Sequence, residues 1–210
     1  MVAENFHKPA LFGKGEFEGF PSGEDPAAVM RAAHATAHAL VTRAREGDDP
    51  QVVDRLVSYT DEHGIDALAE LWARSLPHTL PGALWRIYLV RVLIRQDPDG
   101  VALLFQRGTE VLRTIDPIVA GAPDPAGPQE VTELADQILR GLFTGDFALA
   151  LDRAAAFCRV MAAGAASVAD DQDAASPARS TELTTRALRL STTADELTTC
   201  ARMARADTLD

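Results

Sequence analysis

Signals for the start of a helix recur along this chain and constrain its fold more than any other feature. Asp25-Pro26, Asp49-Pro50 and Asp97-Pro98 each place an N-cap acceptor before a proline, and Ser176-Pro177 repeats the device near the C-terminus. The Asp or Ser side chain accepts a hydrogen bond from an unpaired backbone N–H, and proline at the first helical position has no N–H to lose. These four pairs therefore predict four helix starts.

The spacing of the apolar residues extends this pattern to an all-α fold. No run of β-branched or aromatic residues alternates as a strand would, and alanine, the strongest helix former, supplies much of the 47% hydrophobic content. We expect a compact array of seven to eight helices around one central apolar helix. The expected ranges are 26–46, 50–62, 65–75, 80–96, 98–116, 128–143, 146–163 and 177–206.

The helix over 80–96 is the expected centre of the array because it is apolar nearly all round. Its charged residues, Arg86, Arg91 and Arg95, do not lie on one solvent-facing stripe of a helix. At least one of these arginines should therefore extend along the surface to solvent or pair with a carboxylate in the body of the protein.

Composition divides the chain into four parts. Residues 1–24 form an irregular arm rich in Phe and Gly, which either docks on the body or binds a partner. Residues 25–163 form the helical core domain, and residues 164–176 are small, polar and acidic, as in a flexible linker. Residues 177–210 hold a semi-independent C-terminal helix.

The C-terminal helix carries a heptad pattern in which Leu and Ala recur at alternating spacings of four and three residues. We expect this seam to pack on the body, and a homodimer or docking onto another protein is the alternative. The flanking positions carry no opposed charge pairs that would specify a zipper partner. The seam residues are Leu183, Ala187, Leu190, Ala194, Leu197, Ala201 and Ala204.

The charge balance argues against whole classes of partner. The chain has 31 Asp and Glu against 20 Lys and Arg, for a net charge of −11 at pH 7. A nucleic-acid binder normally needs a basic stripe, and an anionic membrane surface also attracts basic segments. We expect neither partner, no transmembrane helix and a cytoplasmic location.

One histidine pair has the spacing of metal ligands. His34 and His38 lie one helical turn apart, so both imidazoles project from the same side of the helix. Glu62 or His63 would supply a third ligand for Zn²⁺ if the first two helices pack antiparallel. The alternative is that the two histidines merely border an apolar face.

A second group of residues, around the Pro77–Pro81 connection, predicts a site for a small ligand or an anion. Trp72 and Trp85 flank the Pro77–Pro81 connection, Thr79 is a natural N-cap, and Arg86 follows shortly after. Free N–H groups at a helix start bind anions, and two tryptophans can line a pocket. Filling of the core and simple capping are the alternatives.

No catalytic signature, such as a phosphate-binding loop, a nucleophile elbow or a CxxC motif, is present. Cys158 is expected to pack as a small apolar residue, and Cys200 borders the seam. We therefore expect a non-catalytic regulatory or adaptor protein without a cofactor. Its partner would be another protein or a second copy, bound through the C-terminal helix. A metal-binding protein and a small-ligand pocket are the alternatives.

Overall fold

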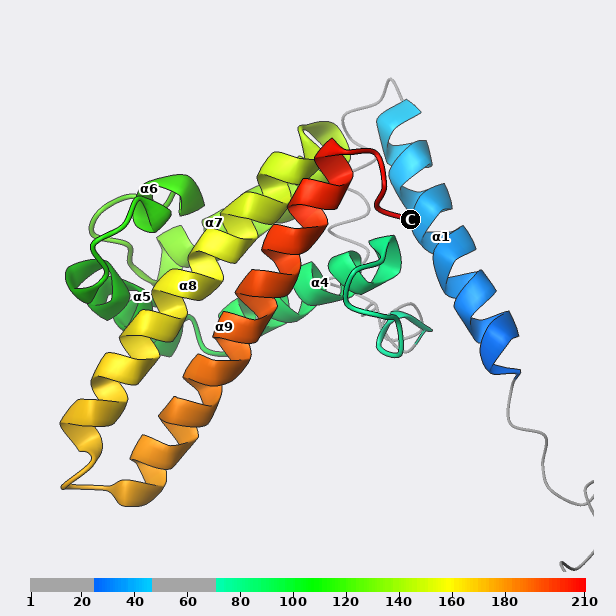
Figure 1. Ribbon diagram of the computed structural model, residues 1–210. Helices are drawn as coiled ribbons and strands as arrows, with labels where there is room; N and C mark the ends of the chain where they lie inside the picture. Colours follow the sequence, from blue (N-terminus) through cyan, green and yellow to red (C-terminus); the bar gives the residue numbers. More distant parts are fainter. Residues whose placement is uncertain (1–24, 47–70) are drawn as a thin grey trace, which may run out of the picture.

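A computed structural model describes residues 25–46 and 71–210 of the chain, and helices are the regular secondary structure of this part (Figure 1). The all-α class is thereby confirmed. The expected arm over 1–24, the helix over 50–62 and most of the helix over 65–75 lie outside the described residues.

The described residues form seven helices. They are α1 (Pro26–Glu46), α4 (Leu80–Gln96), α5 (Pro98–Val111), α6 (Asp116–Ala120), α7 (Pro128–Thr144), α8 (Phe147–Gln172) and α9 (Pro177–Arg205).

The helix-start signals act largely as expected. The Asp97 carboxylate accepts a hydrogen bond from the Gly100 N–H at 3.0 Å, and Asp25 accepts one from the Ala27 N–H at 3.0 Å. Pro177 opens α9, although the Ser176 side chain forms no capping hydrogen bond. Asp146 caps α8, because its carboxylate accepts a hydrogen bond from the Leu149 N–H at 3.0 Å. No proline follows Asp146, so this cap lacks the sequence signal of the other helix starts.

The flexible linker expected over 164–176 is a helix for most of its length. α8 continues to Gln172, and only four residues connect it to α9. Ala165 and Ala169 are buried in the core shared with α9. Small alanine side chains therefore form the buried face of this part of α8, where the sequence shows no stripe of large apolar residues. The two helices form a long antiparallel hairpin (Figure 1). α9 is therefore part of the main core.

The helix expected over 98–116 is two helices. α5 ends at Val111 because Leu112 adopts an extended conformation, and the short α6 then starts at Asp116. Pro117 lies in the first turn of α6, where its missing N–H costs nothing.

α4 lies at the centre, as expected, but shares this position with α8. α4 contacts α1, α5, α7, α8 and α9, while α8 contacts α4, α5, α6, α7 and α9. The expected pairing of the α4 arginines is confirmed as well. Arg86 pairs with Glu196 of α9, while Arg91 and Arg95 reach Asp136 of α7 at 3.0 and 3.4 Å.

The Arg91–Asp136 pair is a largely buried charge pair between α4 and α7. Arg91 is only 5% exposed, so Asp136→Ala would remove a carboxylate that pairs with a nearly buried charge. We expect the free energy of unfolding to fall by about 3 kcal/mol, measured by urea denaturation. The double variant Arg91→Met, Asp136→Leu should recover most of this loss, and a double variant as unstable as Asp136→Ala would contradict the argument.

Two glycines allow α5 and α8 to cross at very short distance. A Cβ atom on Gly108 would lie 1.9 Å from the Val160 carbonyl oxygen, and one on Gly164 would lie 1.8 Å from the Leu104 carbonyl oxygen. Backbone atoms of each helix thus occupy the place of a side chain on the other. Neither position can accept alanine without a displacement of the helices.

Gly164→Ala tests this close crossing. The added methyl group must push α8 away from α5, so the free energy of unfolding should fall by about 3 kcal/mol despite the better helix propensity of alanine. Chemical denaturation measures the change. Ala166→Ser, two residues further on at an exposed position of α8, serves as the control and should change stability by less than about 0.5 kcal/mol. A stabilised Gly164→Ala variant would contradict the account.

Candidate functional site

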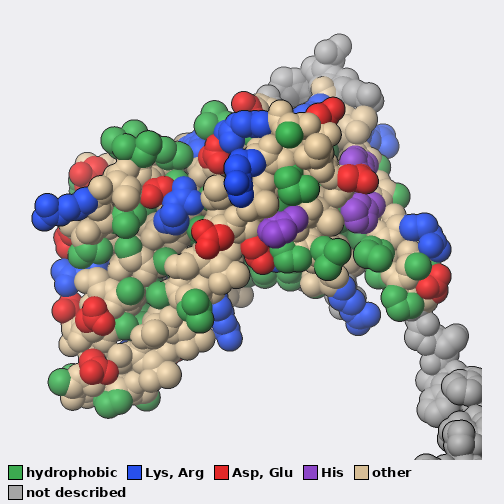
Figure 2. Space-filling model, in the orientation of Figure 1, with side chains coloured by type: hydrophobic (Ala, Val, Ile, Leu, Met, Phe, Trp, Pro, Cys, Tyr) green, Lys and Arg blue, Asp and Glu red, His purple; other side chains and the backbone are tan. Residues whose placement is uncertain are grey.

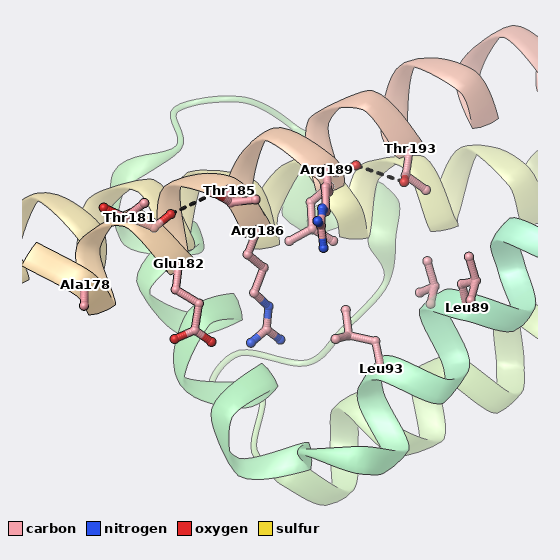
Figure 3. A pocket seen from close by; sticks show the side chains of 11 residues that line it. Leu89, Leu93, Ala178, Thr181, Glu182, Thr185, Arg186, Arg189 and Thr193 are labelled. Atoms are coloured by element: carbon pink, nitrogen blue, oxygen red, sulfur yellow. Dashed lines mark hydrogen bonds between the residues drawn. The ribbon is translucent and has the colours of Figure 1, made fainter.

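A groove of about 720 Å³ lies between α4 and α9. Its volume is within the range of small-molecule sites, roughly 300–1,000 Å³. We refer to it as the α4–α9 groove (Figure 3). Its lining residues are Leu89, Val90 and Leu93 of α4, and Ala178, Thr181, Glu182, Thr185, Arg186, Arg189, Leu190 and Thr193 of α9.

The groove combines an apolar wall with a cationic one. Leu89 and Leu93 project from α4, while the long side chains of Glu182 and Arg186 project from α9 towards the same space (Figure 3). Leu89 is 45% exposed, so part of the apolar wall is open to solvent. The groove can therefore hold a molecule that is apolar along most of its length and polar at one point.

Arg186 is the unusual residue of this groove. Its guanidinium Nε and Nη2 atoms are shielded from solvent and have no hydrogen-bond partner among the described residues. Burial lowers the pKa of Arg186, although the charge of Asp97 partly opposes this effect. Nε and Nη2 form one edge of the guanidinium plane, and this edge can donate two parallel hydrogen bonds to one carboxylate.

The acidic residue at helical spacing from Arg186 is already engaged. Glu182 lies one turn before Arg186, but its carboxylate accepts a hydrogen bond from Arg179 Nη1 at 2.8 Å. Arg189, which also lines the groove, is exposed. The groove therefore presents a local excess of positive charge in an otherwise acidic chain.

The four residues expected to form a ligand site near the start of α4 have partners within the chain. Trp72 is 2% exposed, and its Nε1–H donates to Thr36 Oγ1 at 3.3 Å. Thr79 caps α4 by accepting from the Gly82 N–H at 3.2 Å. Trp85 stacks on Tyr88, with ring centroids 5.5 Å apart.

Arg86, the cation of that expected site, pairs with Glu196 and donates a second hydrogen bond to the Gly82 carbonyl oxygen at 3.0 Å. The guanidinium of Arg86 therefore has hydrogen-bond partners, whereas Nε and Nη2 of Arg186 have none among the described residues. The structure thus brings the expected ligand residues together around the start of α4 as packing and capping groups.

The heptad seam is used inside the chain. Leu183, Ala187, Leu190, Ala194, Leu197 and Ala201 are buried, and Ala204 packs partly buried against the same core. α9 contacts α8 far more than any other helix. Packing of the seam on the body of the protein is the arrangement that the sequence favoured. The side of α9 next to the seam lines the groove with α4.

The histidine pair meets a carboxylate from the C-terminal segment. His38 Nε2 lies 2.7 Å and His34 Nδ1 lies 4.0 Å from Asp210 Oδ1. Figure 2 shows two histidine side chains around an acidic one at the surface. Glu62 and His63, the expected third ligands, lie outside the described residues.

Both cysteines are buried, and burial raises the pKa of Cys158 to about 12 and that of Cys200 to about 11. The nearby Arg159 charge only partly opposes the shift at Cys158. Cys200 Sγ lies 3.3 Å from the Pro77 carbonyl oxygen, to which its thiol donates. Neither thiol is suited to nucleophilic chemistry near pH 7.

We expect both thiols to resist maleimide labelling at pH 8 in the folded protein and to react rapidly in urea, as followed by mass spectrometry. The thiolate is the reactive form, and the raised pKa values suppress it in the native state. Above the unfolded thiol pKa of about 8.5, the unfolded chain loses its thiol protons first, so stability should fall as pH rises. Rapid native labelling of Cys200 would contradict this assignment.

Two functional candidates could not be recognised from the sequence. In the sequence, Arg186 resembles any surface arginine of a helix. Its place in the groove depends on the packing of α4 beside α9. Asp210 lies 172 residues from His38 along the chain. No local pattern links these residues.

Comparison with known proteins gave no significant match among protein-family models, curated proteins or solved structures. In the part of the chain that the structure describes, no helix combines the length and apolar character needed to cross a membrane.

Proposed function

We propose that this chain is a ligand-binding protein whose α4–α9 groove takes a small carboxylate with an apolar body, such as a medium-chain alkanoate. The observation that carries this proposal is the unpaired edge of Arg186, whose Nε and Nη2 are shielded from water. A cation shielded in this way destabilises the protein unless an anion pairs with it.

A carboxylate matches the unpaired edge of Arg186 in geometry as well as in charge. Its two oxygens accept the two parallel hydrogen bonds that Nε and Nη2 can donate. Arg186 must turn this edge towards the groove to meet a ligand, which its long flexible side chain allows. Glu182 does not compete for the edge in this arrangement because it is bonded to Arg179.

The α4 wall accounts for the apolar part of the ligand. Leu89, Val90 and Leu93 line the groove opposite Arg186, and each methylene of a ligand buried against them contributes about 0.8 kcal/mol. Affinity should therefore increase with alkyl chain length until the groove is filled. The regulatory or adaptor role expected from the sequence stays a prediction, and binding of such a ligand would be a means of regulation.

Titration calorimetry with sodium decanoate tests the proposal. Wild-type protein should bind one decanoate per chain, and n-decanol, which lacks the carboxylate, should bind at least ten-fold more weakly. Arg186→Met should weaken decanoate binding by at least about ten-fold, since a hydrogen bond to a charged group contributes about 1.5–3 kcal/mol. Arg202→Met, an exposed arginine of the same helix outside the groove, should bind as wild type does.

The same pair of variants separates binding from folding. Without ligand, Arg186→Met should raise the free energy of unfolding by about 1 kcal/mol because it removes a poorly paired cation. Arg202→Met should change it by less than about 0.5 kcal/mol. Absence of decanoate binding to the wild type, or equal binding by Arg186→Met, would refute the proposal.

A further inference from the structure

We propose that His34, His38 and Asp210 form a Zn²⁺ site that fastens the C-terminal segment to α1. Their ligating atoms all lie within 4.8 Å of one another. The two histidines come from one turn of α1, and the carboxylate comes from the residue that follows α9 by five positions. This site is separate from the α4–α9 groove and does not depend on the proposed function.

The distances suit a shared ion after small side-chain movements. Zinc bonds to nitrogen and oxygen are about 2.0–2.2 Å, so two ligand atoms of a tetrahedral site lie roughly 3.3 Å apart. The observed distances from Asp210 Oδ1 are 2.7 Å to His38 Nε2 and 4.0 Å to His34 Nδ1, one shorter and one longer than this value. Insertion of the ion would replace the His38–Asp210 hydrogen bond by bonds to the metal.

Asp210 is held in place by its backbone as well as by its side chain. The Leu80 N–H at the start of α4 donates to the Asp210 carbonyl oxygen at 2.8 Å. The preceding Leu209 packs partly buried against the core, and the Thr208 N–H donates to the Met203 carbonyl oxygen at 2.9 Å. The carboxylate is thereby placed beside the histidines before an ion binds, so binding does not have to order this segment.

The donor set favours Zn²⁺ over Mg²⁺. Two imidazole nitrogens suit zinc and other transition ions, whereas Mg²⁺ prefers oxygen ligands. The side chains of His34, His38 and Asp210 are 28%, 48% and 86% exposed, so an ion can reach them directly from solvent. Three protein ligands leave the fourth position of a tetrahedral site to water.

The experiment is a Zn²⁺ titration of the full chain by calorimetry, with native mass spectrometry to count the ions. Wild-type protein should bind one Zn²⁺ per chain, and Mg²⁺ should not compete. Asp210→Asn, which keeps the backbone hydrogen bond to Leu80, should weaken binding by at least about ten-fold, as should His34→Ala and His38→Ala. Even residues that only support a metal ligand contribute about 10–100-fold.

Two further variants decide the identity of the site. His78→Ala removes an exposed histidine outside the cluster and should bind Zn²⁺ as wild type does. His63→Ala removes the third ligand expected from the sequence, and it too should bind normally if Asp210 holds the ion. Loss of binding in His63→Ala with unchanged binding in Asp210→Asn would overturn the assignment.

Thermal unfolding gives a readout that does not depend on stoichiometry. Zinc binds only the folded arrangement of these three residues, so it should raise the unfolding temperature of the wild type. Asp210→Asn should unfold at the wild-type temperature without zinc and gain no stability from it. A wild type that binds no Zn²⁺, or an Asp210→Asn variant stabilised as strongly as the wild type, would refute the site.

Discussion

The crossing of α5 and α8 at two glycines is the constraint on which the rest of the structure depends. Gly108 and Gly164 let the helix backbones meet where a side chain would otherwise stand. α8 can then be enclosed, with α5, α6 and α7 packed on it together with α9. The alanines of α8 serve the same purpose towards α9, because small side chains allow close approach of two helices. The core thus combines close helix approach at small residues with large buried side chains elsewhere, such as Phe157 and Ile87.

This packing decides which side of α9 is open. The Leu and Ala seam of α9 packs against α8, so a dimer through the seam would require the two helices to separate. The adjacent side of α9 meets α4 less closely, and the groove lies between them. The segment after α9 then returns to the start of α4, where the Leu80 N–H holds Asp210 beside α1. Both candidate sites therefore follow from the position of α9 on α8.

Local patterns predicted the helices well and the sites poorly, for physical reasons. Proline after an N-cap residue marks a helix start by backbone chemistry alone, so α1 and α5 begin where expected. The break between α5 and α6 is not predicted because proline can either precede or follow a helix break, and Pro117 lies at the start of the second helix. The prediction of a flexible linker over 164–176 is wrong as far as Gln172, because buried alanines leave no hydrophobic stripe in the sequence. Arg186 and Asp210 were missed because their surroundings come from distant segments, and only the histidine pair could be found from its spacing.

The arginines show why Arg186 points to a ligand. Arg86 and Arg91 lie on α4 and each meets a carboxylate of another helix, so their burial is compensated within the chain. The negative charges of Asp97 and Glu182 act on Arg186, yet its Nε and Nη2 atoms have no hydrogen-bond partner among the described residues. A chain with 31 acidic residues does not lack carboxylates for such a position. For stability alone, leucine or methionine beside Leu93 and Leu190 would serve better. An anion bound in the groove, as proposed above, would supply Arg186 with the partner that Arg86 and Arg91 find within the chain.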